Sequence, residues 1–174
     1  CDPGGKWGWP PEKQGEPMPT RAPAVVAGLL SEIGMDVEVH EVQNAYNPDE
    51  TLTSPLVQAY LDGESGDKRL EFEAHYDAET VQEELWDRDP FGAEIEGDIL
   101  HGRGVVDSKG QLAGMIAAVE AINNAGVDLD GDIIISSGPD GEYGYSSWGK
   151  SAELDPNIDY IIAGEATYVS DRDV

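Results

Sequence analysis

Cysteine, positive charge and long apolar runs are all scarce in this sequence. Cys1 is the only cysteine among 174 residues, so an intramolecular disulfide is excluded and we expect a cytoplasmic protein. No apolar run reaches the length of a membrane span, and the N-terminus lacks the basic and apolar segments of a signal peptide. A chain that begins with cysteine could be a processed lipoprotein, but we favour a fragment of a longer protein.

The shortage of basic residues leaves a large negative charge. The chain has 10 lysines and arginines against 36 aspartates and glutamates, which gives a net charge of −26 at pH 7. A surface of this sign repels nucleic acids and anionic membranes, so we expect neither as a partner. The acids are dispersed through apparently folded segments and form no single tail. Such a composition is typical of a halophilic protein, in which a high salt concentration screens the repulsion.

Strand and helix patterns alternate along the chain and predict an α/β domain. Residues 1–20 are rich in Gly and Pro and are expected to form an N-terminal arm or loop, whereas residues 21–174 form the domain. Apolar residues at helical spacing predict helices over 22–34 and 112–126. Short alternating or β-branched runs predict strands over 35–42, 55–63, 69–77, 131–138 and 159–166. We therefore expect a mostly parallel sheet with helices on both faces.

One imidazole and four carboxylates follow the predicted strands or lie in a glycine-hinged loop between them. Parallel sheets carry their functional residues just beyond the carboxyl ends of the strands. The residues at these positions are His75, Asp77, Asp107, Glu142 and Glu165. A cluster of like charges is unfavourable unless a cation lies among it. Mixed His, Asp and Glu ligands suit zinc, with cobalt or manganese as alternatives.

Taken singly, these residues have simpler explanations. His75 could be an ordinary histidine at a strand end, and most of the 36 acids are expected to be solvated surface groups. Residues 102–107, GRGVVD, do not fit a dinucleotide-binding loop, because Asp107 replaces the third glycine. Residues 128–132, DLDGD, do not fit a calcium loop, because no Glu stands at the twelfth position. The order and spacing of the whole set favour a metal site.

Five segments, in this order, resemble the M20 family of metallopeptidases and deacylases. They are HYD at 75–77, LWDRDPF at 85–91, GRGVVDSKG at 102–110, PDGEYG at 139–144 and AGEAT at 163–167. The family includes aminoacylases, acetylornithine and succinyl-diaminopimelate deacylases, and glutamate carboxypeptidases. The resemblance therefore implies a zinc-peptidase-like α/β domain and a hydrolase whose substrates are N-acyl amino acids or small peptides.

The resemblance also implies a site for two zinc ions, or for Co²⁺ or Mn²⁺. His75 and Glu165 would bind one ion, Glu142 would bind the other, and Asp107 would bridge them. Asp77 would be a catalytic residue that orients the imidazole of His75. A water molecule between the ions would attack the amide carbonyl. The peptide bond after the bridging aspartate is cis in the family, and the same is expected here.

Position 141 departs from the family pattern. Glu142 corresponds to the second, metal-binding glutamate of the family's Glu-Glu pair, and Gly141 stands where the first glutamate, the general base, is expected. Loss of a general base typically lowers the rate by about 10²–10⁴-fold. Asp140 is adjacent, but it points away if the backbone stays extended. Exchange of Gly141 for glutamate is therefore expected to restore both the base and the rate.

The extent of the resemblance bears on domain organisation. The family's last metal ligand is a histidine that follows an inserted lid and dimerisation domain, and all three histidines of this chain lie upstream of that point. We expect residues 21–174 to be part of a catalytic domain whose full-length form is a homodimer. Two hypotheses remain: an amidohydrolase acting on peptides or N-acyl amino acids, or a catalytically impaired metal- or peptide-binding relative.

Overall fold

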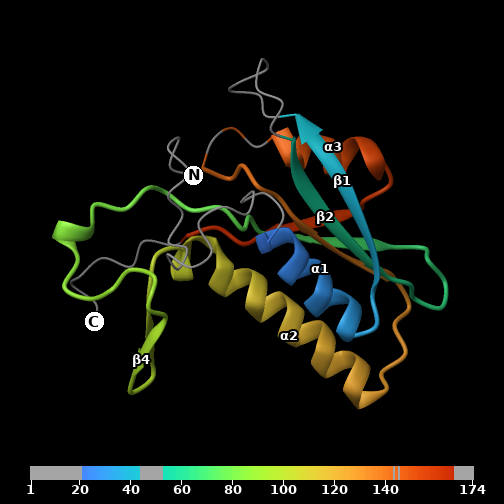
Figure 1. Ribbon diagram of the computed structural model, residues 1–174. Helices are drawn as coiled ribbons and strands as arrows, with labels where there is room; N and C mark the ends of the chain where they lie inside the picture. Colours follow the sequence, from blue (N-terminus) through green and yellow to red (C-terminus); the bar gives the residue numbers. More distant parts are fainter. Residues whose placement is uncertain (1–20, 44–52, 143, 145, 167–174) are drawn as a thin grey trace.

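A five-stranded sheet in the order β1-β2-β6-β3-β7 forms the centre of the computed structural model (Figure 1). The structure describes residues 21–43, 53–142, 144 and 146–166, and the predicted arm over residues 1–20 lies outside them. The strands are β1 (Asp36–Gln43), β2 (Thr53–Leu61), β3 (Arg69–Glu73), β4 (Glu94–Glu96), β5 (Ile99–His101), β6 (Asp132–Ser137) and β7 (Tyr160–Ala163). The helices are α1 (Arg21–Glu32), α2 (Gly110–Ala125) and α3 (Ser146–Leu154), with short turns η3 (Glu83–Leu85) and η4 (Val105–Lys109).

The α/β class predicted from the sequence is confirmed, and the sheet is mixed. β3 runs parallel to both β6 and β7, whereas β1 and β2, and β2 and β6, pair antiparallel. The expectation of a mostly parallel sheet therefore holds only for β3, β6 and β7. The β-branched run at 133–135 indicated a buried strand, but burial alone does not fix the direction of its neighbours.

Helices lie on both faces of the sheet, as predicted. α1 and α2 pack on one face, and α3 lies against the other (Figure 1). Val57 and Ala59 of β2 belong to the core under α1 and α2, whereas Gln58 points to the opposite side and donates from Nε2 to Oγ of Ser151 in α3 at 2.8 Å. The buried core residues include Val26, Leu30, Val57, Ala59, Leu112, Ile116, Val119, Ile133 and Ile135.

α2, the longest of the described helices, ends at the glycine that was predicted to stop it. Gly126 has a φ of 62°, and its N–H donates to the carbonyl oxygen of Asn123 at 3.1 Å. Glycine adopts this left-handed conformation without the steric penalty of a Cβ. Leu112, Ile116 and Val119 form the buried stripe of the helix at intervals of four and three residues.

One helix and one two-stranded hairpin were not predicted from the sequence. The buried residues of α3 are Ser147 and Ser151, and a helix without an apolar stripe gives no periodic signal. β4 and β5 form a hairpin that turns at Gly97, with a φ of 60°, and lies away from the main sheet (Figure 1). Its strands have three residues each and are mostly exposed, so they show no alternation of buried and exposed positions.

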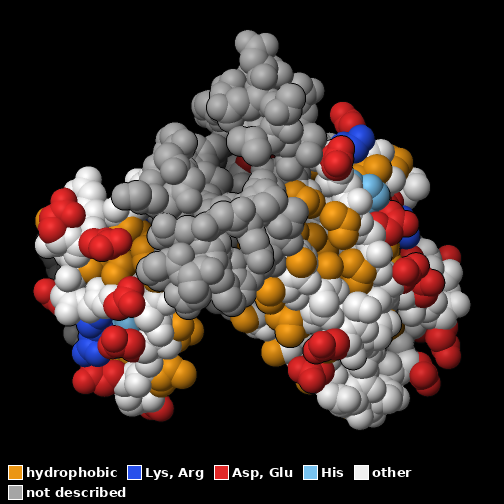
Figure 2. Space-filling view, in the orientation of Figure 1, with side chains coloured by type: hydrophobic (Ala, Val, Ile, Leu, Met, Phe, Trp, Pro, Cys, Tyr) orange, Lys and Arg blue, Asp and Glu red, His pale blue; other side chains and the backbone are white. Residues whose placement is uncertain are grey.

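Acidic side chains are spread over the visible surface, where Lys and Arg side chains are few (Figure 2). This distribution agrees with the dispersed acids of the sequence and its net charge of −26. Within the part of the chain that the structure describes, none of the helices combines the length and the apolar character that a membrane span requires.

Candidate metal centre

The residues that leave β3 remain paired with the chain that leaves β6. The N–H of Ala74 donates to the carbonyl of Ser136 at 3.1 Å, and the N–H of Tyr76 donates to the carbonyl of Gly138 at 2.9 Å. This pairing holds the intervening His75 at the carboxyl edge of the parallel strands. The site thus begins where a parallel sheet generally carries its functional residues.

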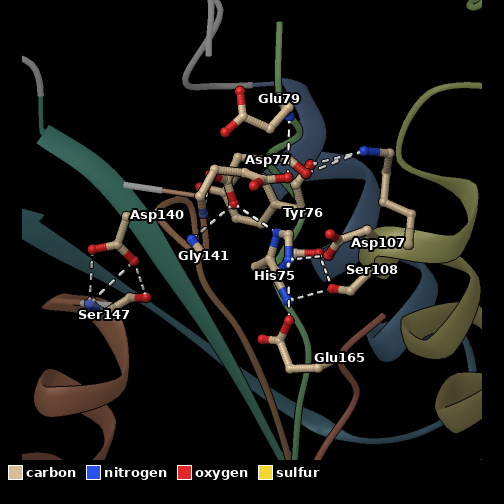
Figure 3. Close-up of polar contacts among 12 residues, drawn as sticks. His75, Tyr76, Asp77, Glu79, Asp107, Ser108, Asp140, Gly141, Ser147 and Glu165 are labelled. Carbon is tan, nitrogen blue, oxygen red and sulfur yellow. Dashed lines mark hydrogen bonds and ion pairs between the residues drawn. The ribbon is translucent and has the colours of Figure 1, made fainter. Parts of the chain in front are cut away.

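The imidazole of His75 lies between two carboxylates (Figure 3). Nδ1 is 2.9 Å from Oδ1 of Asp77, and Nε2 is 2.9 Å from Oδ1 of Asp107. Oε2 of Glu165, just after β7, is 4.0 Å from the same Nε2. The side chains of His75 and Asp77 are 2% and 1% exposed. Burial lowers the pKa of His75, but the three carboxylates outweigh this effect and raise it to about 9.

The turn η4, immediately before α2, presents Asp107. Asp107 has non-helical backbone angles, with φ −127° and ψ 94°, and the peptide bond between Asp107 and Ser108 is cis, as expected from the family resemblance. Ser108 is buried and joins this turn to the end of β3. The N–H of His75 donates to Oγ of Ser108 at 2.9 Å, and the same Oγ donates to the carbonyl oxygen of His75 at 2.9 Å.

Asp77 also holds the chain that follows β6. The N–H of Gly141 donates to Oδ1 of Asp77 at 3.0 Å, and the N–H of Glu142 donates to Oδ2 at 3.1 Å. Oε1 of Glu142 in turn accepts a hydrogen bond from the N–H of Glu79 at 3.1 Å. Both oxygens of the buried Asp77 are therefore satisfied, and they fix the approach of Glu142 to His75.

The side chains of three of the four predicted ligands lie close together. The ligand atoms of His75, Asp107 and Glu142 all lie within 4.8 Å of one another. Glu165 lies beside them, and its buried Oε1 has no hydrogen-bond partner among the described residues. Burial raises the pKa of Glu142 and of Glu165. The negative charge of Asp107 raises both pKa values further, whereas His75 lowers them. One imidazole and three mutually repelling carboxylates, with one buried oxygen unpaired, fit a divalent cation.

Asp140 points away from this group, as expected for an extended backbone (Figure 3). Its Oδ1 and Oδ2 accept hydrogen bonds from the N–H of Ser147 at 3.2 and 3.1 Å, and Oγ of Ser147 also donates to Oδ1. Ser147 belongs to the first turn of α3, where backbone N–H groups lack partners within the helix. Asp140 therefore caps α3 and is not placed to accept a proton at the candidate metal centre.

Two residues of the site were missed by the sequence analysis. Ser108 bonds to the backbone of His75, and Lys109 donates from Nζ to the carbonyl oxygens of Tyr76 at 3.4 Å and Asp77 at 3.3 Å. Burial lowers the pKa of Lys109, while nearby carboxylates oppose this decrease. Both residues directly follow the candidate ligand Asp107 in the GRGVVDSKG segment, and this position is the sequence feature that could have indicated their role.

Comparison with known proteins gives a family. Residues 72–172 match the family described as Peptidase family M20/M25/M40. The chain is 35% identical over 156 residues to a succinyl-diaminopimelate desuccinylase of Ehrlichia ruminantium (strain Gardel), covering 87% of this chain and 39% of that protein. It is 31% identical over 145 residues to the N-formyl-4-amino-5-aminomethyl-2-methylpyrimidine deformylase of Bacillus subtilis (strain 168), covering 82% and 32%. The chain thus spans less than half the length of these curated relatives.

Solved structures share the fold. Human carnosine dipeptidase 1 has a TM-score of 0.70 at 24% identity, over 84% of this chain and 32% of that chain. The dipeptidase Dug1p from Saccharomyces cerevisiae has a TM-score of 0.71 at 22% identity, over 84% and 33%. At such identities the likeness shows the fold alone. The family match covers more than half of the sequence and includes every predicted ligand, and this chain therefore belongs to Peptidase family M20/M25/M40.

Proposed function

We propose that the chain forms the metal-binding part of a hydrolase that cleaves amide bonds in N-acyl amino acids or small peptides. Membership of the family supports a hydrolase of amide bonds. Relatives named as a desuccinylase, a deformylase and dipeptidases support acyl or peptide substrates of low mass. Zinc is the proposed metal, with Co²⁺ or Mn²⁺ as alternatives, and a cytoplasmic, salt-rich setting is proposed from the composition.

The proposed roles follow from the contacts of each side chain. Oδ1 of Asp77 accepts from Nδ1 of His75, which leaves Nε2 as the metal-binding atom. In this proposal His75 and Glu165 would hold one ion, Glu142 would hold a second, and Asp107 would contribute to both. When bound, the metal would polarise an amide carbonyl and lower the pKa of water. The chain's own residues fix the positions of the donors and shield the pair of His75 and Asp77 from solvent.

The observation that carries this proposal is the closeness of His75, Asp107 and Glu142, whose ligand atoms lie within 4.8 Å of one another. Zn²⁺ or Co²⁺ is expected to raise the melting temperature, because a ligand that binds only the folded state stabilises it. His75→Ala and Asp107→Ala are expected to abolish this rise. Glu120→Gln, which removes an exposed carboxylate on α2, serves as the control. A metal response that survives in both site variants contradicts the proposal.

A second candidate is a relative that binds a metal or a peptide without catalysis. Gly141 favours this second candidate, because glycine has no side chain that can accept a proton. The carboxylate of the adjacent Asp140 accepts hydrogen bonds from Ser147 of α3. The two candidates differ in turnover. Metal-dependent hydrolysis of N-acetyl amino acids or dipeptides would support the hydrolase. Metal binding without hydrolysis of either substrate class would support the non-catalytic relative.

A further inference from the structure

Gly141 lies directly against the imidazole of His75. A Cβ on residue 141 would be 2.1 Å from Cγ of His75, 2.3 Å from Cδ2 and 2.6 Å from Cβ. Ordinary van der Waals contact begins at 3.4 Å, and real Cβ atoms essentially never come closer than 3.0 Å to other heavy atoms. The overlap includes Cβ and Cγ at the root of the histidine side chain, so rotation of the ring about the Cβ–Cγ bond could not relieve it.

His75 has little room to retreat from such a Cβ. Its Nδ1 is bonded to Asp77 at 2.9 Å, and its backbone N–H and carbonyl are both bonded to Ser108 at 2.9 Å. Gly141 is equally fixed, because its N–H donates at 3.0 Å to the same Oδ1 of Asp77 that faces the imidazole. One carboxylate oxygen therefore holds the ring and the glycine backbone against each other.

We propose that Gly141 is a positioning residue for His75, whose imidazole occupies the space that any side chain at position 141 would need. This inference rests on the proposed metal centre. It reverses the expectation from the sequence that Gly141→Glu would restore a general base, because a glutamate there would displace the metal ligand. Gly141 is then a requirement of this site, and its exchange for glutamate would not supply a general base.

Zn²⁺ titration of the folded chain tests the proposal directly. Gly141→Ala adds only the Cβ and is expected to weaken Zn²⁺ binding by about 10–100-fold, the range found when the support of a metal ligand is disturbed. Gly149→Ala is the matched control, because a Cβ at Gly149 meets no heavy atom within 4 Å. Gly141→Glu is expected to weaken binding at least as much as Gly141→Ala. Wild-type affinity in Gly141→Ala would overturn the proposal.

A double-mutant cycle tests the packing without any metal. The free energy of unfolding is measured for the wild type, Gly141→Ala, His75→Gly and the double variant. His75→Gly is chosen because the Cβ of His75 is itself part of the overlap. Gly141→Ala is expected to destabilise the wild type but to have little effect in the His75→Gly background. Equal destabilisation in both backgrounds would overturn the inference. Absence of Zn²⁺ binding by the wild type would contradict the proposed function, and the cycle would still decide the role of Gly141.

Discussion

The carboxylate of Asp77 faces Nδ1 of His75 at 2.9 Å and turns Nε2 of the imidazole toward Asp107. Because the N–H groups of Gly141 and Glu142 donate to the same carboxylate, Asp77 joins the end of β3 to the chain that follows β6. One buried side chain thereby sets the positions of two proposed metal ligands. Substitutions at Asp77 and at residues near it can test which side chain orients His75, which caps α3 and which stabilises the packing of the buried polar groups.

Asp77→Asn tests the orienting role. The amide keeps the size of the side chain but has a single acceptor oxygen, so it cannot accept from His75, Gly141 and Glu142 together. We expect the affinity for Zn²⁺ to fall by about 10–100-fold, as measured by calorimetric titration. Asp62→Asn, at an exposed position, should leave the affinity unchanged. Equal affinities in the two variants would show that Asp77 does not orient the ligand.

Asp140→Ala tests whether Asp140 serves the helix or the candidate metal centre. Its carboxylate accepts from Ser147 at the start of α3, so its removal should lower the free energy of unfolding by about 0.5–2 kcal/mol, as loss of a helix cap does. The affinity for Zn²⁺ should change far less than in Asp77→Asn. Urea unfolding and metal titration of the same variant provide both values. Strong loss of metal binding with unchanged stability would assign Asp140 to the metal centre.

Two adjacent serines in β6 provide a matched pair for the buried polar network beneath α3. Oγ of Ser136 accepts from Nε2 of Gln58 at 3.1 Å and donates to Oε1 of the fully buried Glu71. Ser136→Ala leaves these buried groups short of a partner and should cost about 1–3 kcal/mol in urea unfolding. Oγ of Ser137 is buried without a partner among the described residues, so Ser137→Ala should be neutral or slightly stabilising. A larger loss of unfolding free energy in Ser137→Ala than in Ser136→Ala would contradict the proposed role of Ser136 in the network.

Salt is expected to stabilise the fold. With a net charge of −26, repulsion between surface carboxylates opposes compaction at low ionic strength, and molar KCl screens it. The melting temperature followed by circular dichroism should therefore rise with KCl concentration. Sucrose, which stabilises by exclusion from the surface and carries no charge, separates screening from a general solvent effect. A melting temperature independent of KCl would count against the halophilic interpretation.

Local patterns in the sequence were sufficient for most of the secondary structure and for the composition of the site. The helical spacing before Gly34 and before Gly126 placed α1 and α2, because an apolar stripe is a property of neighbouring residues. α3 was missed because its stability depends on Ser147, Ser151 and the cap from Asp140, which are tertiary contacts of polar residues. The sequence also could not predict which strands run parallel, because a β-branched run indicates that a strand is buried but not the direction of its neighbours.

At the site, the sequence by itself determined which residue types follow the strands, and hence that His75, Asp107, Glu142 and Glu165 are candidate ligands. Only the tertiary structure decided how they meet. In the folded chain, the ligand atoms of His75, Asp107 and Glu142 lie within 4.8 Å of one another. Asp140 accepts a hydrogen bond from Ser147 of α3, and Gly141 packs against the imidazole of His75. The physical reason is that steric overlap and hydrogen bonding act between residues that are distant in the chain. The sequence could show that a glutamate is absent at position 141, but only the packed fold shows that the imidazole of His75 occupies its space.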